Sequence, residues 1–286
     1  IGGTSVKLGI FEEDGTLVKK WEIPTRKEEN GKYILGDIAA SIRRTAKESG
    51  LELSDFSGAG MGFPGPVLPD GHSRLLDGMV VKSGNDANVA ALGEMWQGGG
   101  KGYKNLVMVT LGTGVGGGII LNEKIWTGEQ GVGGEIGHIH VMEGEKEACN
   151  CGGHGCLEQV ASATGIARTA RRMLAADNRP STLRSLKNIS AKNVLDAAKA
   201  GDALALESLN KSCYYLGWAL ATISMVLDPQ AFLIGGGVSK AGTFLTDIIK
   251  RYHDELSPMA TKKADIVLAK LGNDAGIYGA AKLIIG

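Results

Sequence analysis

Residues 106–118, LVMVTLGTGVGGG, decide the fold class of this 286-residue chain. Residues 106–111 are an apolar run of strand length, and 116–121 predict a second strand that pairs with it. Five of the seven residues from Gly112 to Gly118 are glycine. Such a run allows a tight turn whose N–H groups converge on an anion, although a flexible loop is the simpler alternative. Neither a Gly-Lys-Ser/Thr triplet nor a helix follows, so the turn is not a Walker A loop or a clean dinucleotide fingerprint.

Apolar periodicity predicts the elements on both sides of this stretch. Upstream we expect strands at 4–11, 17–23 and 57–62, with helices at 32–49 and 86–96. Downstream we expect helices at 163–176, 191–200, 202–226, 241–256 and 274–285, with strands at 231–234 and 265–269. Strands that later alternate with helices predict an α/β fold of two lobes, and the glycine-rich stretch 98–102 is the expected boundary.

Composition narrows the class of protein. Lys+Arg and Asp+Glu both number 31, and this zero net charge argues against broad binding to nucleic acid or anionic membranes. No apolar run reaches about 18 residues, so no membrane span is predicted. Glycine supplies 44 residues, roughly twice its usual share. Since glycine weakens helices and strands, the surplus should lie where the backbone closely approaches a ligand.

The most specific local signal is CNCGGHGC at 149–156, which holds three thiols within eight residues. Tetrahedral Zn²⁺ takes four nitrogen or sulfur ligands, and three cysteines with one histidine are a common set. His138, His140 and His154 are the candidates for the fourth ligand. The alternative is a redox pair of Cys149 with Cys151, and Cys213 is expected in the core.

Several weaker signals accompany the cysteines. Gly2-Gly3-Thr4 could bind phosphate or be an ordinary turn, and Gly235-Gly236-Gly237 ends a strand where α/β folds bind ligands. Asp86 could accept a proton from a substrate hydroxyl that Asn85 positions, or it could simply cap a helix. The carboxylates of Glu135 and Glu158 flank the cysteines and could hold a polyol, or be solvated surface charges.

Together, and in this order, these stretches resemble the ROK family of sugar kinases (repressors, open reading frames, kinases), most closely its bacterial glucokinases. The matching stretches are IGGT (1–4), GFPGP (62–66), NDANVAALGE (85–94), LGTGVGGG (111–118), GEIGH (134–138), CNCGGHGCLE (149–158) and IGGGVS (234–239). The resemblance implies two actin-like, ribonuclease H-like α/β lobes with the active site in the cleft between them. The small lobe would be 1–104, with helix 274–286 packed back on it, and the large lobe 105–273 would carry the zinc loop.

The same resemblance implies roles for individual residues. Asp86 matches the general base that takes the proton from the sugar 6-hydroxyl. The sugar-binding positions would be Gly65, Asn85, Asp86, Glu135, His138 and Glu158, and the structural zinc ligands His138, Cys149, Cys151 and Cys156. The phosphate-binding turns would be Gly2, Gly3, Thr4, Gly112, Thr113 and Gly114, with Gly236 and Gly237 on the adenosine side.

The activity implied is phosphorylation of glucose at the 6-hydroxyl by ATP with Mg²⁺, in a cytoplasmic homodimer or homotetramer that binds neither nucleic acid nor membrane. One alternative is another hexose kinase of the family, acting on N-acetylmannosamine, N-acetylglucosamine or fructose. A second is a sugar-sensing repressor, which would need a helix-turn-helix before IGGT, and a third is a non-catalytic zinc module.

Three features depart from the family pattern. The family has an acidic residue immediately before IGGT, whereas this sequence begins at Ile1. Only 18 residues separate Pro66 from Asn85, and Gly84 stands where the family usually has an acidic residue. We expect further residues of the gene product at the start and within 67–84.

Overall fold

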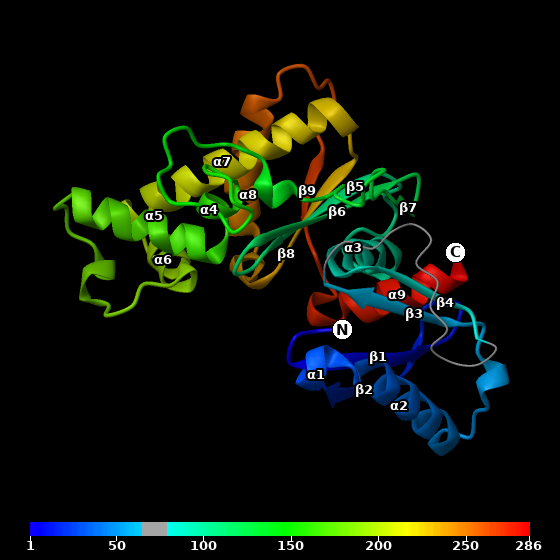
Figure 1. Cartoon of the computed structure of the whole chain (residues 1–286). Helices are drawn as coiled ribbons and strands as arrows, with labels where there is room; N and C mark the ends of the chain where they lie inside the picture. The colour runs from blue at the N-terminus through cyan, green and yellow to red at the C-terminus, as the bar shows by residue number, and fades with distance from the viewer. Residues whose placement is uncertain (65–78) are drawn as a thin grey trace. The chain divides into compact units, whose positions relative to one another are not determined.

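The computed structural model describes residues 1–64 and 79–286 (Figure 1). Gly65, expected near the sugar, and 67–78 of the shortened segment lie outside the described residues. The chain divides into two compact units, which consist of Ile1–Gly102, Gly118–Gly133 and Leu271–Gly286, and of Tyr103–Gly117 and Gly134–Lys270. The lobe boundaries expected after 104 and 273 remain a prediction. Among the described helices, none is long and apolar enough to cross a membrane.

The first unit contains two small sheets and the helices around them. Its elements are β1 (Ser5–Phe11), β2 (Leu17–Pro24), α1 (Glu28–Gly31), α2 (Ile34–Glu48), β3 (Ala59–Phe63), β4 (Val81–Asn85), α3 (Asp86–Gln97), β7 (Lys124–Ile125) and α9 (Ala275–Ile285). β1 and β2 form an antiparallel hairpin, and β3 pairs with β4 in parallel. The register of β3 with β4 sets Phe63 opposite Asn85, which places the start of α3 at the carboxyl end of this strand pair.

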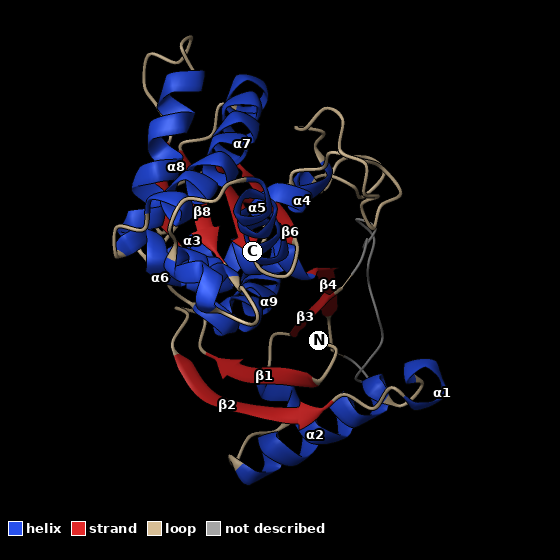
Figure 2. Ribbon diagram, turned by 90° about the vertical axis from the view of Figure 1, so that its left-hand side faces the viewer, coloured by secondary structure: helices blue, strands red, loops and turns tan. Residues whose placement is uncertain are grey.

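The hairpin and α2 share an apolar core. Val6 and Leu8 are alternate residues of β1, so both point to one face, where they pack with Ile38 of α2. Trp21 of β2 packs against the same cluster and donates its Nε1 hydrogen to Ser41 Oγ of α2 at 2.8 Å. Figure 2 shows α2 running along the hairpin. This helix therefore covers one face of the sheet.

α3 and α9 lie against each other although they come from opposite ends of the sequence (Figure 1). A Cβ on Gly93 would lie 2.2 Å from the Ala275 carbonyl oxygen, and one on Gly279 would lie 1.6 Å from that of Val89. Both distances are far below any real contact, so only glycine permits this helix pair. The close approach makes α9 part of the first unit.

The second unit is built on parallel strands covered by helices. Its elements are β5 (Leu106–Leu111), α4 (Glu158–Ala161), α5 (Ala163–Ala176), α6 (Ala191–Lys199), α7 (Ala203–Leu227), β8 (Ala231–Gly235), α8 (Thr243–Leu256) and β9 (Asp265–Leu268), with β6 (Val115–Leu121) continuing into the first unit. The strand order is β7-β6-β5-β8-β9, as expected for 106–111 beside 116–121. β5 pairs with β8, and β8 with β9, in parallel.

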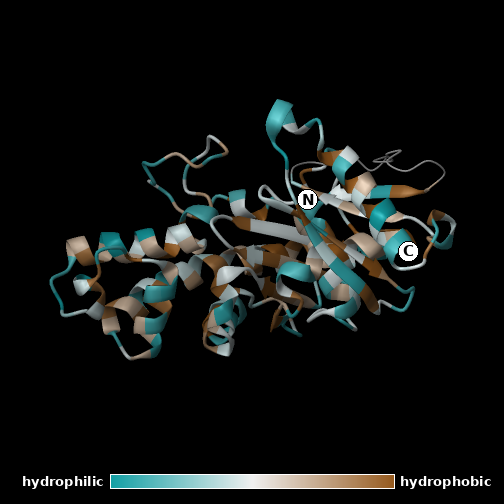
Figure 3. Cartoon of the chain, turned by 90° about the horizontal axis from the view of Figure 1, so that it is seen from below, coloured by the Kyte–Doolittle hydropathy of each residue, from teal (hydrophilic) through white to brown (hydrophobic). Residues whose placement is uncertain are grey.

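The central strands β5 and β8 of this unit are largely buried, and the helices of the unit supply the cover that buried strands need. All five residues of β8 are buried, which is typical of a parallel strand covered on both faces. The long helix α7 packs against α5, α6 and α8. The N-cap side chains of Ser162, Ser190 and Asp202 accept backbone N–H groups and fix where α5, α6 and α7 begin. The helices carry both teal and brown residues in Figure 3, as amphipathic helices should.

Candidate active site

The predicted base Asp86 is the first residue of α3 and is exposed. Asn85, not Asp86, caps the helix, because Asn85 Oδ1 accepts the N–H groups of Ala87 at 2.9 Å and Asn88 at 3.2 Å. Asp86 Oδ1 accepts the Ala87 N–H as well, at 2.8 Å. The Asp86 side chain therefore lies at the N-terminus of α3, where the backbone N–H groups form the positive end of the helix dipole. Contact between Asn85 and a substrate hydroxyl would use Nδ2.

The turn at Gly2-Gly3-Thr4 lies in the first unit, as Asp86 does, and hydrogen bonds hold its first residue. The Gly2 N–H donates to the Ser5 carbonyl at 3.0 Å, and Thr25 Oγ1 donates to the Gly2 carbonyl at 2.7 Å. Gly2, Gly3 and Thr4 are all exposed. The turn therefore presents backbone and hydroxyl groups to solvent in a fixed loop, which suits an anion.

A cavity of about 840 Å³ in the first unit reaches Gly2 and Asp86. Its wall combines apolar side chains, including Val6, Ile38 and Ile277, with polar ones, including Lys7 and Asp55. Of the described positions expected to bind the sugar, only Asp86 lines it. We therefore do not assign this cavity to the sugar.

In the second unit, His138, Cys149, Cys151 and Cys156 converge, with all four ligand atoms within 4.8 Å of one another. Cys149 Sγ lies 3.6 Å from His138 Nδ1, and Cys151 Sγ lies 3.6 Å from Cys156 Sγ. Tetrahedral ligands at the Zn–S distance of about 2.3 Å lie roughly 3.7 Å apart, so the donor set fits zinc. His138 comes from the 3-10 helix at Ile136–His138, and the three cysteines come from the loop that follows it.

Geometry also decides between the candidates for the fourth ligand. His140 Nδ1 faces the His154 carbonyl oxygen at 2.8 Å, and His154 Nδ1 donates to the Glu147 carbonyl oxygen at 3.1 Å. Both rings are thus engaged in the loop backbone, whereas His138 faces the thiols. All four cysteines of the chain are unpaired thiols, which leaves a Cys149–Cys151 redox pair without a bond in this structure.

The thiols are chemically unequal. Burial, together with the neighbouring thiols of Cys151 and Cys149, raises the pKa of Cys156 to about 12. The Gly153 N–H, and then the Cys156 thiol, lower the pKa of the exposed Cys151. Because thiolates are the ligands, a metal ion would have to displace the proton that Cys156 otherwise keeps.

Glu158 connects the cysteine loop to the glycine turn after β5. Glu158 Oε2 accepts the Val115 N–H at 3.0 Å, and Cys149 Sγ lies 3.9 Å from Glu158 Oε1. A Cβ on Gly114 would lie 2.0 Å from Glu158 Oε2, so this approach needs glycine. The Gly112 carbonyl oxygen accepts the Ala163 N–H at 2.8 Å. The turn is therefore held by α5 and Glu158 rather than left flexible.

Two further predicted groups lie beside these. Glu135 Oε2 lies 4.0 Å from His138 Nε2, on the ring edge away from the thiols. One imidazole can thus face a metal with Nδ1 and a polar ligand with Nε2. Gly236 and Gly237 directly follow β8, whose Gly235 pairs with Thr110 of β5. The two glycine turns therefore begin at the carboxyl ends of adjacent parallel strands, where α/β folds bind ligands.

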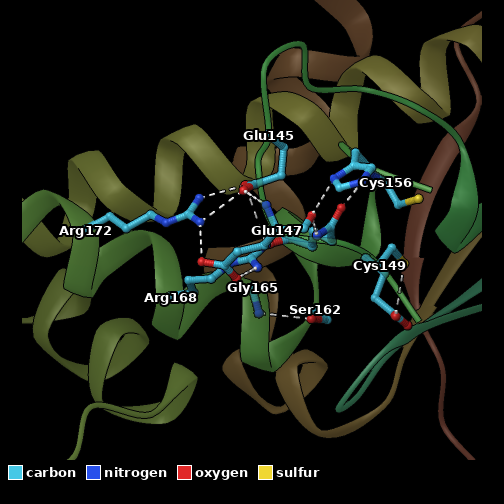
Figure 4. Close-up of polar contacts among 11 residues, drawn as sticks. Glu145, Glu147, Cys149, Cys156, Ser162, Gly165, Arg168 and Arg172 are labelled. Atoms are coloured by element: carbon cyan, nitrogen blue, oxygen red, sulfur yellow. Dashed lines mark hydrogen bonds and ion pairs between the residues drawn. The ribbon is translucent and has the colours of Figure 1, made fainter. Parts of the chain in front are cut away.

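The sequence did not predict a cluster of charged side chains next to the cysteine loop, which Figure 4 shows. Glu145 and Glu147 of the loop meet Arg168 and Arg172 of α5. The spacing of the two arginines, four residues apart on one helix face, was the available signal. Nothing in that spacing names the acidic partners, which come from a loop without periodicity.

Comparison with known proteins adds an independent finding. The family model described as "ROK family" matches residues 77–286. A glucokinase of Halalkalibacterium halodurans is 40% identical over 99% of this chain and 93% of its own length. A glucokinase of Thermotoga maritima is 37% identical over 99% of this chain and 95% of its own length.

A solved structure is similar over the same extent. It is a ROK family glucokinase from Streptomyces griseus in complex with glucose and AMPPNP. Its TM-score is 0.76 at 32% identity, and the match covers 99% of this chain and 96% of that one. The similarity therefore includes both compact units.

Proposed function

The chain belongs to the ROK family, and on that premise we propose that it is a glucokinase, which transfers the γ-phosphoryl group of ATP to the 6-hydroxyl of glucose. The glucokinases of Halalkalibacterium halodurans and Thermotoga maritima each match nearly its full length. The structure from S. griseus contains glucose together with AMPPNP, which supports ATP as the donor.

The observation that best supports this proposal is the position of Glu158. One carboxylate contacts the backbone of the glycine turn assigned to phosphate and lies beside a cysteine assigned to metal. The Glu158 carboxylate could also accept a hydrogen bond from a sugar hydroxyl. A single side chain thus brings together the groups expected to bind phosphate, metal and sugar.

The proposed mechanism requires positioning and one base. The sugar oxygen attacks the γ-phosphorus, the bond from phosphorus to the leaving oxygen of ADP breaks, and Asp86 accepts the hydroxyl proton. Phosphoryl transfer through a loose transition state needs little further covalent help. The Gly2 and Gly112 N–H groups donate to carbonyl oxygens of their own chain segments, at Ser5 and Gly114. The remaining backbone N–H groups of the turns at 2–4 and 112–114 would be the donors for the charge on the transferred group.

We assign the metals different roles. Zn²⁺ on His138, Cys149, Cys151 and Cys156 would be structural, because all four positions of a tetrahedral site are taken by protein. It would hold the His138 ring so that Nε2 can meet the sugar. Mg²⁺ would enter with ATP, held mainly by phosphates and water, and would neutralise phosphate charge.

The protein's context is also proposed. Three clustered thiols used as metal ligands need reducing conditions, which supports a cytoplasmic location. An apolar stripe on α7, formed by Tyr214, Trp218, Met225 and Val226, is exposed. Stripes of this kind mark protein interfaces, and it supports a homodimer or homotetramer.

A substrate panel tests the function. Purified protein with Mg-ATP would be offered glucose, mannose, fructose, N-acetylmannosamine and N-acetylglucosamine, and ADP release and 6-phosphorylated product would be measured. We expect the highest kcat/KM with glucose. Preference for an N-acetylated sugar or fructose would reassign the substrate within the family, and no transfer to any sugar would contradict a kinase.

A further inference from the structure

We propose that Arg168 and Arg172 of α5 are positioning residues, which hold both ends of the cysteine loop, Cys149–Cys156, in the geometry that binds metal. They do so through Glu145 and Glu147, which Figure 4 shows beside the two arginines, and through the carbonyl oxygen of Gln159. The inference rests on the proposed zinc site, and the experiment below separates the two.

The entry of the cysteine loop is held by a pair of carboxylates. Arg172 binds Glu145 with both nitrogens, Nη1 to Oε2 at 2.7 Å and Nη2 to Oε1 at 3.1 Å. Arg172 Nη2 also donates to Glu147 Oε1, and Arg168 Nη1 donates to Glu147 Oε2, each at 2.6 Å. Glu147 is two residues before the ligand Cys149. The helix thus fixes the backbone that leads into the first thiol.

The exit of the loop is held by Gln159. Gln159 Nε2 donates to the Glu147 carbonyl oxygen at 2.9 Å, and Gln159 Oε1 accepts the Cys156 N–H at 3.1 Å. Arg168 Nη2 donates to the Gln159 carbonyl oxygen. The same helix therefore anchors the last thiol, and Glu158 lies between these two anchored residues.

The cluster has the properties of a rigid support. The Glu145 side chain is only 5% exposed. Arg172 is the main cause that holds the pKa of Glu145 at about 2, so the carboxylate stays charged at neutral pH. Paired arginine–carboxylate forks restrict orientation as well as distance. A loop rich in glycine has no core of its own, so the geometry of its thiols must come from such contacts.

Two consequences follow for the reaction. Without Arg172, the entry to Cys149 would sample more conformations, and zinc binding would have to order it at a cost in affinity. Glu158, between the anchored Cys156 and Gln159, would lose part of its fixed position. The effect on glucose should appear in KM more than in kcat, since neither arginine contacts the reacting atoms.

Zinc affinity tests this directly. Wild type, Arg172→Met, Arg172→Lys and Arg171→Met would be stripped of metal, and Zn²⁺ affinity measured by competition with a chromophoric chelator. Arg171 is the matched control, on the same helix but bonded to the Ile189 carbonyl oxygen. Supporting contacts around metal ligands contribute about 10- to 100-fold in affinity, and we expect that loss in Arg172→Met. Arg172→Lys should retain part of the affinity, and Arg171→Met should match wild type.

A second readout uses the zinc-saturated enzymes. Arg172→Met should raise the glucose KM several-fold with a smaller change in kcat. Equal zinc affinity in Arg172→Met and Arg171→Met, with only a lower melting temperature, would overturn the positioning role. If Arg172→Met does not fold, Arg172→Lys against Arg171→Lys decides by the same criterion. Wild type that binds no zinc would overturn the metal site itself.

Discussion

At the scale of single residues, the neighbours Asn85 and Asp86 contribute differently to the start of α3. Asn85 supplies the oxygen that caps α3, which leaves Asp86 exposed at the first helical position. The sequence offered two interpretations of Asp86, capping or catalysis. Asn85 occupies the N-cap position, and Asp86 also accepts the Ala87 N–H. Catalysis by Asp86 stays a prediction.

Replacing Asp86 by Asn should reduce kcat for glucose by about 10²- to 10⁴-fold, the usual contribution of a general base. The amide keeps the size of the side chain but cannot accept the hydroxyl proton. Steady-state kinetics with Mg-ATP measure the effect. Asp196→Asn on α6 is the control, because the Asp196 side chain forms an exposed ion pair with the nearby Lys192. Near-normal turnover of Asp86→Asn would exclude the base assignment.

At the scale of elements, Glu94 ties the end of α3 to two segments. The side chain is fully buried. Its Oε2 accepts the Gly99 N–H at 2.8 Å and its Oε1 accepts the Leu271 N–H at 2.7 Å. Gly99 lies shortly before the chain first leaves the first unit after Gly102, and Leu271 is where it returns for the last time. One carboxylate therefore holds these two segments of the first unit together.

Glu94→Gln should destabilise the protein by about 1–3 kcal/mol, because the new amide nitrogen would face a buried N–H donor that loses its acceptor. Urea unfolding measures the change. Glu48→Gln, at the exposed end of α2, should leave the free energy of unfolding within about 0.5 kcal/mol of wild type. Equal stability of both variants would contradict the role of Glu94.

A buried histidine links α8 to α7 and β8. His253 Nε2 lies 2.9 Å from Ser224 Oγ, and its ring meets the Phe232 ring edge-on with centroids 5.5 Å apart. Burial lowers the pKa of His253 below its ordinary 6.5, and Lys250 and Lys263 lower it further against the opposing effect of Asp254. The neutral ring is therefore the form that the fold accommodates.

This histidine should make stability depend on pH. Because the folded pKa is below the unfolded one, its contribution is complete above about pH 6.5 and is lost as the pH falls through the lowered value. Urea unfolding at pH 7.5 and 5.5 should show a larger decrease in wild type than in His253→Gln. The same decrease in both proteins would mean that other groups cause it.

Prediction from sequence succeeded where periodicity was strong. The strand at 106–111 and the helix at 163–176 were predicted to the residue, since each has one apolar pattern and a clear cap or glycine at its end. The sequence did not predict β4, because VKSGN has only one apolar residue and therefore no apolar alternation. Its strand conformation comes from parallel pairing with β3. The cysteine spacing alone left three histidines open as the fourth ligand, and the resemblance to the family implied His138. The structure groups His138 with Cys149, Cys151 and Cys156.

At the scale of the whole molecule, the apolar stripe on α7 predicts association. Trp218→Glu should convert the assembly to monomers in light scattering coupled to size exclusion, because a buried charge would oppose the interface. Trp126→Glu is the matched control, since both tryptophans are 43% exposed and Trp126 is not on α7. A monomeric wild type would refute the proposed homo-oligomer.

Metal should contribute to the stability of the molecule through mass action. Free Zn²⁺ at 100 times its Kd should stabilise the fold by about 2.7 kcal/mol, and a strong chelator should remove this gain. Cys151→Ser should abolish the zinc-dependent rise in melting temperature. Cys213→Ser, in the core of α7, should lower the melting temperature but keep the rise. An unchanged response in Cys151→Ser would contradict the ligand set.

The packing of α9 on α3 has a consequence for synthesis on the ribosome. Glu94 and its partner Leu271 are 177 positions apart in the sequence. At about 5–20 residues per second, the second emerges roughly 10–35 s after the first. During that interval α9 has not yet been made, so the face of α3 that contains Gly93 lacks the helix that packs against it. The second unit has all of its residues once Lys270 is made, whereas the first unit still lacks Leu271–Gly286. Chaperones and proteases can therefore act on an incomplete first unit when the second is already complete.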